Sequence, residues 1–169
     1  FTTTPGVFSA GNIDPGSQIL AAAMPEGLKG DIADLGAGWG YLSSKILTHD
    51  LVSSLDLIEA DATALECAKL NINDPRANFH WDDATSWAGS YDSVIMNPPF
   101  HTGRLGNPDL GRAFITNAAR NLRPKGDLWM VANRHLPYEQ VLNQCFESVV
   151  EIQGDSRFKL FQSSRPKRK

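Results

Sequence analysis

Short apolar runs alternate along this chain with longer segments of helical periodicity. The pattern predicts an α/β fold with a mostly parallel sheet, helices on both faces and right-handed crossovers. In such a fold, ligands bind beyond the carboxyl ends of the strands. Strands are predicted near residues 31–36, 53–59, 77–81, 91–96 and 127–133, and helices near 15–24, 40–48, 61–72, 108–122 and 137–146.

The length of 169 residues, 41% of them hydrophobic, suits one globular domain. Two β-like runs at 149–152 and 158–161, with Gly154 between them, predict a closing hairpin. We expect a core at 31–163, a lid or helix segment before it at 1–24, and a basic tail at 164–169. Such a tail could contact phosphates, but a short basic terminus is more commonly solvated.

Two local signals predict helix boundaries. Asp14-Pro15 has the form of an N-cap followed by proline at the first helical position. Arg123-Pro124-Lys125-Gly126 is expected to end a helix before the apolar run at 128–131.

A glycine-rich loop follows the first predicted strand, at Asp34-Leu35-Gly36-Ala37-Gly38-Trp39-Gly40. Gly36, Gly38 and Gly40 allow the backbone to turn tightly and to approach a ligand closely. Dinucleotide enzymes use a related loop at the same place, so the loop alone indicates only a nucleotide-type cofactor. Asp34 favours S-adenosylmethionine, because a carboxylate here would repel a pyrophosphate and attract the ammonium of a methionine group.

Acidic residues also follow the second and third predicted strands. Glu59 ends the second strand, about 20 residues beyond the loop, where it can accept both ribose hydroxyls. Asp61 is explained more simply as the cap of the following helix. We prefer Asp83 over Asp82 as the acceptor for the adenine amino group. Each acid alone could be a solvated loop residue, but acids after three successive strands favour a cofactor site.

The motif Asn97-Pro98-Pro99-Phe100 follows the fourth predicted strand. An exocyclic amino group is a poor nucleophile, because its lone pair is delocalised into the attached π system. The Asn97 side-chain oxygen and the Pro98 carbonyl can both accept hydrogen bonds from such a group, while Pro98 and Pro99 stiffen the backbone. These acceptors would direct the nitrogen at the sulfonium methyl and stabilise its developing charge.

Phe100 offers a flat apolar face on which a planar substrate can stack, an interaction worth ~1–3 kcal/mol. A rigid turn is the alternative interpretation of the motif taken alone. Its position after the fourth strand, together with the glycine loop after the first, favours catalysis on a planar nitrogen.

Composition argues against several other classes of protein. The net charge of −3 disfavours a domain that holds nucleic acid by bulk electrostatics, although a local basic patch is compatible with it. No apolar run approaches the ~20 residues that cross a bilayer, and no signal peptide is recognisable, so we expect a cytosolic protein. Cys67 and Cys145 lie far apart and the histidines show no ligand spacing, so we expect neither a disulfide nor a metal.

Taken together, several motifs resemble the C-terminal catalytic half of the ribosomal RNA guanine-N2 methyltransferases, within the methyltransferase small domain group. The resemblance implies a Rossmann-like class I methyltransferase fold with a mostly parallel seven-stranded sheet. It also implies methyl transfer from S-adenosylmethionine to guanine N2, with ribosomal RNA or a ribosomal subunit as partner. The motifs are Gly6-Val7-Phe8-Ser9, Asp14-Pro15-Gly16-Ser17, the glycine loop, Asn97-Pro98-Pro99-Phe100-His101, Val131-Ala132-Asn133 with Leu136-Pro137-Tyr138, and Arg157-Phe158-Lys159.

The resemblance carries the family's catalytic motif onto residues 97–100 and its cofactor acids onto Asp34, Glu59 and Asp83. Phe8, Asp14 and Ser17 match more weakly, and Ser17 joins the expected cofactor-binding set. The resemblance implies that the segment from Phe8 to Ser17 closes over the methionine end of the cofactor or over the target base. Members of the family usually have a second, degenerate methyltransferase-like domain upstream, to which nothing here corresponds. Because the chain also begins at Phe1 rather than methionine, we expect it to be the C-terminal part of a longer protein.

Other functions remain open at the level of sequence. Adenine N6 and protein glutamine are the nearest alternative acceptors, and Phe100 favours a base, because protein-glutamine enzymes more usually have tyrosine there. A methyltransferase-like module that binds cofactor or RNA without turnover is a second alternative. A dehydrogenase on the same fold is a third, which Asp34 opposes.

Overall fold

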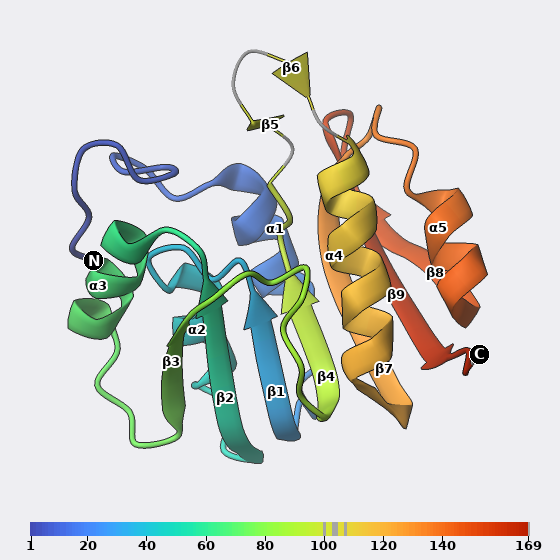
Figure 1. Cartoon of the computed structure of the whole chain (residues 1–169), viewed down its shortest axis with the longest axis horizontal. Coiled ribbons are helices and arrows are strands. Elements are labelled where there is room, and N and C mark those ends of the chain that lie inside the picture. The colour runs from blue at the N-terminus through green and yellow to red at the C-terminus, as the bar shows by residue number, and fades with distance from the viewer. Residues whose placement is uncertain (100, 103–104, 107, 169) are drawn as a thin grey trace.

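The computed structural model describes residues 1–99, 101–102, 105–106 and 108–168, with side chains described outside 100–107 (Figure 1). One seven-stranded sheet forms the middle layer, in the order β3-β2-β1-β4-β7-β9-β8. Its strands are β1 (Gly30–Leu35), β2 (Val52–Glu59), β3 (Ala77–Trp81), β4 (Tyr91–Met96), β7 (Leu122–Asn133), β8 (Phe146–Gly154) and β9 (Phe158–Pro166).

Strand pairing confirms the expected fold class. From β3 across to β7 all neighbours are parallel, and β9 is antiparallel to both β7 and β8. The sheet is therefore mostly parallel, with a C-terminal hairpin at one edge. Two short strands, β5 (His101–Thr102) and β6 (Leu105–Gly106), form a separate hairpin that projects from the molecule next to β4 and α4 (Figure 1).

Helices cover both faces of the sheet, as the alternating pattern predicts. On one face, α1 (Pro15–Ala23), α2 (Tyr41–Ile46) and α3 (Ala62–Asn71) bury Leu20, Ile46 and Ala68 in one apolar cluster. On the other face, α4 (Pro108–Asn121) and α5 (Glu139–Cys145) bury Ile115 and Leu142 in a second cluster. Among the described residues, no helix has the length and apolar character that would let it cross a membrane.

The direction of strand order reverses at β1. The chain runs from β1 outward through β2 to β3, then returns to β4 on the other side of β1 and continues to β7. The loops after β1 and β4 therefore lead away from each other and leave a crevice at the carboxyl ends of these strands. The glycine loop and Asn97 both lie at this crevice.

The predicted helices and the first four predicted strands agree with the structure to within two residues at each end. The fifth strand differs, because it begins at Leu122 rather than near 127. Tyr91 pairs with Leu122 and Ser93 with Asp127, so residues 123–126 form an irregularity inside β7 instead of a break before it. Arg123 explains the arrangement, since its guanidinium forms ion pairs with Asp31 at 2.7 Å and Asp92 at 2.6 Å.

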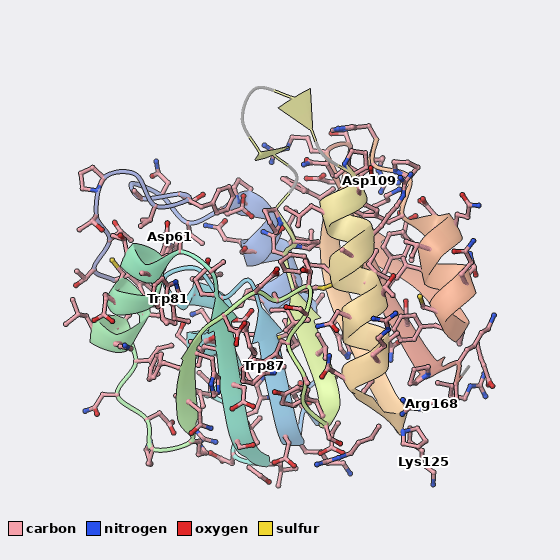
Figure 2. All side chains as sticks on the ribbon, in the orientation of Figure 1. Asp61, Trp81, Trp87, Asp109, Lys125 and Arg168 are labelled. Carbon is pink, nitrogen blue, oxygen red and sulfur yellow. The ribbon has the colours of Figure 1, made fainter. Side chains whose placement is uncertain are left out.

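The basic side chains of the C-terminal segment agree with the expected solvated tail at 164–169, since Arg165, Lys167 and Arg168 are exposed, but the backbone of the segment is paired. β9 continues through Pro166, because Ser164 and Pro166 still pair with β8. Beyond it, the Lys167 backbone N–H donates to the Cys145 carbonyl at 2.8 Å. Arg168 donates to the Leu122 carbonyl at 2.5 Å and lies beside the end of α4 (Figure 2). Backbone pairing therefore orders most of this basic segment.

The conformation of Gly40, at the start of α2, predicts how a substitution there affects the stability of the fold. It has φ +90°, and a Cβ added there would lie 2.8 Å from Ile72 Cδ1. We expect Gly40→Ala to lower the free energy of unfolding by about 1–3 kcal/mol in urea denaturation, because a side chain in this left-handed conformation is strained.

Gly11→Ala is the matched control, since a Cβ at Gly11 would meet nothing within 4 Å and its backbone is not left-handed. We expect the control to stay within ~0.5 kcal/mol of the wild type. Equal losses from both substitutions would contradict the conformational argument.

Candidate functional site

Two adjoining cavities lie at the carboxyl ends of β1, β2 and β4. The larger has a volume of about 320 Å³ and the smaller of about 50 Å³. Four residues line both: Phe8, Gly36, Gly38 and Asn97. The larger is also lined by Glu59, Ala60, Asp83, Ala84, Pro98, Pro99, Leu110 and Phe114, and the smaller by Ser9, Asp14, Ser17, Ala37, Trp39, Tyr41 and Leu42.

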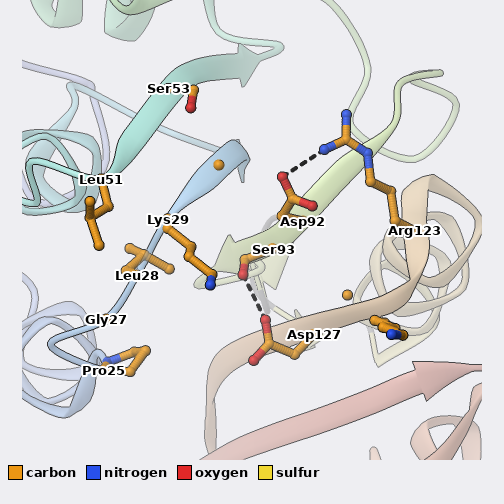
Figure 3. A pocket seen from close by; sticks show the side chains of 13 residues that line it. Pro25, Gly27, Leu28, Lys29, Leu51, Ser53, Asp92, Ser93, Arg123 and Asp127 are labelled. Atoms are coloured by element: carbon orange, nitrogen blue, oxygen red, sulfur yellow. Dashed lines mark hydrogen bonds and ion pairs between the residues drawn. The ribbon is translucent and has the colours of Figure 1, made fainter.

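A more voluminous hollow, about 580 Å³, lies at the opposite end of the sheet (Figure 3). It borders the amino ends of β1 and β4, at Gly30 and Asp92. Four of its polar side chains are already paired with one another, since Arg123 pairs with Asp92 and Ser93 donates to Asp127 at 2.6 Å. Because open α/β sheets bind ligands at the carboxyl ends of their strands, the two adjoining cavities are the candidate site.

The glycine loop forms the floor of the candidate site. Gly36 and Gly38 have φ of +75° and +55°, conformations that residues with side chains rarely adopt. The backbone N–H groups of Gly36 and Ala37 both donate to the Ile58 carbonyl, which holds the loop against the end of β2. A Cβ at Gly38 would meet nothing within 4 Å, so the loop backbone faces open space. The loop can therefore admit a ligand against its main chain.

Asp34 lies beneath the glycine loop rather than at its mouth, where the sequence placed it. Its side chain is fully buried and is not among the residues that line either cavity. Oδ2 accepts a hydrogen bond from Ser43 Oγ at 2.6 Å, and Oδ1 has no partner among the described residues. The pKa of Asp34 is raised to about 7, mainly because the carboxyl is buried; the Ser43 hydrogen bond opposes this rise and the nearby charge of Glu59 adds to it. The ionised form of a buried carboxylate with one oxygen unpaired would be stabilised by a nearby cation.

Glu59 and Asp83 line the larger cavity. Glu59 Oε2 accepts from the Gly38 N–H at 2.7 Å, and Oε1 accepts from the Asp61 N–H at 2.8 Å. Each carboxylate oxygen has a second lone pair, so Glu59 can still accept from a ligand hydroxyl. Asp61 caps α3 through the Thr63 and Ala64 N–H groups, which confirms its predicted role.

Asp83 uses one carboxylate oxygen locally and leaves the other for a ligand. Oδ1 accepts from the backbone N–H and the hydroxyl of Thr85, at 2.8 and 2.7 Å. Asp82 is not among the residues that line the cavity, and its Oδ1 accepts from the Asp83 N–H at 2.7 Å. This placement favours Asp83 over Asp82.

The orientation of Asn97 is set by two acceptors. Its Nδ2 donates to Asp14 Oδ2 and to Ser17 Oγ, each at 2.8 Å. Both N–H bonds of the amide are thereby used, so Oδ1 remains as an acceptor. Pro98 and Pro99 line the larger cavity beside it. Asn97 Oδ1 can therefore accept from a ligand, and the Pro98 carbonyl is a candidate for a second acceptor at the same cavity.

Asp14 has a second role that sequence reasoning did not identify. It caps α1 by accepting from the Ser17 N–H at 2.8 Å, as predicted, and the same oxygen accepts from Asn97. Ser43, which donates to Asp34, was also missed. Neither contact leaves a local signal in the sequence, because Asp14 and Asn97 are separated by 83 positions. Ser43 looks like an ordinary polar residue of a helix.

Some predicted site residues are not tested by this geometry. Phe100 lies outside the described residues, so its stacking role stays a prediction. Only the backbone of His101 is described, in β5. Over the described part of the chain, no group of three or more His, Cys, Asp or Glu side chains could hold a metal ion.

Comparison with known proteins identifies a family. The model of the "Methyltransferase small domain" family matches residues 1–162. Ribosomal RNA small subunit methyltransferase C of Salmonella choleraesuis is 34% identical over 167 residues, covering 95% of this chain and 48% of that protein. The protein of the same name from Psychromonas ingrahamii is 35% identical over 159 residues, covering 92% and 46%. The chain therefore spans about half the length of the curated relatives it matches.

Solved structures agree with this assignment. A 16S rRNA N2 methyltransferase of T. thermophilus, in complex with AdoMet and guanosine, has a TM-score of 0.81 and 29% identity, covering 96% of this chain and 46% of that one. A putative RNA methyltransferase of Pyrococcus horikoshii has a TM-score of 0.67 at 21% identity, covering 94% and 84%, which shows the fold alone. The Rossmann-like class I methyltransferase fold implied by the sequence is confirmed.

The buried Asp34 predicts a pH dependence of stability. Its pKa is about 7 in the folded chain and near its ordinary value of 3.8 when unfolded. Between these values the folded state holds a proton that the unfolded state has lost, so the free energy of unfolding falls as pH rises from about 4 to about 7 and then levels off. One unit of pKa difference corresponds to ~1.4 kcal/mol, so several kcal/mol are expected.

Urea unfolding of the ligand-free chain at about pH 5 and about pH 7.5 measures this effect. Asp34→Asn keeps the shape of the side chain without the titrating group. The wild type should therefore lose more stability than this variant over the same interval. Identical losses in the two proteins would rule out Asp34 as the source.

Proposed function

Since the chain belongs to the methyltransferase small domain family, we propose that it transfers a methyl group from S-adenosylmethionine to the N2 amine of a guanine in ribosomal RNA. The observation that carries the proposal is the orientation of Asn97, whose Oδ1 is left as an acceptor beside the glycine loop. The names of the relatives support ribosomal RNA, and the structure solved with AdoMet and guanosine supports the cofactor and the base.

The residues of the site suit S-adenosylmethionine. The loop at Gly36 and Gly38 admits a ligand against its backbone, and Glu59 can accept from the ribose hydroxyls. We propose that Asp83 accepts from the adenine amino group. We also propose that ionised Asp34, whose Oδ1 has no partner among the described residues, attracts the ammonium from beneath the loop. When bound, the cofactor supplies an electrophilic methyl on a sulfonium. Ser17 contributes indirectly, through its contact with Asn97.

Asn97 and Pro98 orient the amine for reaction. Their two oxygens accept the two N–H bonds of the amino group, so the lone pair of its nitrogen points in one direction, toward the methyl. As the nitrogen–carbon bond forms and the carbon–sulfur bond breaks, positive charge develops on the nitrogen. The same two oxygens stabilise that charge because they are already in place. The side chain of Asn97 is neutral, so it orients the amine and does not take its proton, which the methylated nitrogen would release to water.

The partner that we propose is ribosomal RNA or a small ribosomal subunit, and the place of action is the cytoplasm, where ribosomal RNA is available in bacteria such as those of the relatives. Because the chain covers about half of those relatives, the choice of nucleotide is part of this proposal and belongs to the whole protein.

Asn97→Ala tests the proposed reaction. Undermethylated small ribosomal subunits are incubated with labelled S-adenosylmethionine, and the product is mapped by nucleoside mass spectrometry. The wild type should form N2-methylguanine, and the variant should be slower by ~10²-fold or more, as for removal of a preorganised acceptor. Calorimetry should show unchanged cofactor affinity. Label found instead in N6-methyladenine or in protein glutamine would overturn the choice of acceptor.

Ser17→Ala tests how Asn97 is oriented. The substitution removes one acceptor of Asn97 Nδ2, while the cap of α1 is kept because that bond uses the Ser17 backbone N–H. We expect kcat to fall about 2- to 10-fold, the size of one hydrogen bond, with little change in unfolding free energy. Ser44→Ala, which removes a hydroxyl that donates to the Tyr41 carbonyl, is the control, because Ser44 itself lines neither cavity. An unchanged kcat in Ser17→Ala would show that Asp14 alone orients Asn97.

A further inference from the structure

Phe8 is an exposed aromatic residue whose main chain is held in place by its neighbours. Its side chain is 60% exposed, whereas the neighbouring Val7 is buried against Trp39 and Cys67. The Phe8 carbonyl accepts from Trp39 Nε1 at 3.0 Å. These contacts hold the main chain of Phe8 over the glycine loop and leave its ring outside the core. Packing of the fold therefore does not account for a large apolar side chain here.

Phe8 lies where the two cavities adjoin. Phe8, Gly36, Gly38 and Asn97 line both cavities, and so mark the junction between them. Two of these residues are glycines, which leaves Phe8 and Asn97 as the side chains that border the junction within the described part of the chain. Asn97 supplies a polar group at the junction, and Phe8 supplies an apolar aromatic face.

The junction is the place where the reacting groups must meet if the function proposed above is correct. The larger cavity contains the candidate ligands of the adenosyl group, Glu59 and Asp83, and the smaller contains Asp14 and Ser17. The methyl of S-adenosylmethionine sits on the sulfur between its adenosyl and methionine halves. A planar acceptor whose amine is held by Asn97 must therefore present the face of its ring to other groups at this junction.

We propose that the ring of Phe8 is the surface on which the target base stacks while Asn97 and Pro98 hold its amino group. This inference rests on the proposed function and adds a substrate-binding residue to it. Every nucleic-acid base has an apolar π-face, whichever hydrogen-bonding groups lie on its edges. Stacking on an aromatic side chain therefore contributes binding energy that does not depend on which base is bound. Stacking also restricts the base to one plane, so the two acceptors receive its amine in the orientation that reaction requires.

The experiment compares Phe8→Leu, which keeps apolar bulk without an aromatic face, with Phe8→Trp, which keeps the face. KM and kcat are measured with undermethylated small ribosomal subunits, and cofactor affinity is measured by calorimetry with S-adenosylmethionine alone. We expect Phe8→Leu to raise KM between about 5-fold and 150-fold, the range for loss of one base–aromatic stack. Phe8→Trp should stay near the wild type, and cofactor affinity should be unchanged in both.

Phe1→Leu is the matched control, because Phe1 is another exposed aromatic residue of the same segment, packed on Trp39 and outside both cavity linings. It should leave KM unchanged. Weakened cofactor affinity in Phe8→Leu would overturn the inference by showing that the ring covers the sulfonium instead. An unchanged KM in Phe8→Leu, with an active wild type, would overturn this inference alone, whereas a wild type that forms no N2-methylguanine would overturn the proposed function as well.

Discussion

Parallel pairing of β4 beside β1, with β2 on the other side, is the constraint on which the site depends. Parallel strands place their carboxyl ends at one edge of the sheet, and the reversal of strand order separates the loops that follow β1 and β4. The glycine loop and Asn97, which are far apart in sequence, therefore border the same space. The two apolar clusters that cover the faces of the sheet maintain this pairing, so the site depends on the whole core.

One carboxylate connects the N-terminal segment to the candidate catalytic residue. Asp14 Oδ2 caps α1 and also accepts from Asn97, so the start of a helix serves as a positioning element. The same N-terminal segment also lies over the glycine loop, where Trp39 Nε1 donates a hydrogen bond to the Phe8 carbonyl. Residues before the sheet therefore form part of the site wall, in addition to the loops after the strands.

The acids around the glycine loop have different environments and so suit different tasks. Glu59 and Asp83 line a cavity and retain lone pairs, which suits hydrogen bonding to neutral hydroxyl and amino groups. Asp34 is buried, and burial raises its pKa to about 7, so its ionised form is favoured by a nearby cation. A cationic ligand above the loop would supply the counter-charge that Asp34 lacks among the described residues.

The sequence by itself determined the order of strands and helices, the glycine loop and the Asn97 motif, because periodicity, caps and positive-φ glycines are local properties. It also predicted that Glu59 and Asp83 lie at the carboxyl ends of neighbouring strands, where both line the larger cavity, and their roles as cofactor ligands stay predictions. Only the tertiary structure decided that Asp34 lies under the loop, that Asp14 orients Asn97 and that residues 123–126 form an irregularity inside β7. Burial and long-range hydrogen bonds depend on which segments pack together, and a linear pattern does not contain that information.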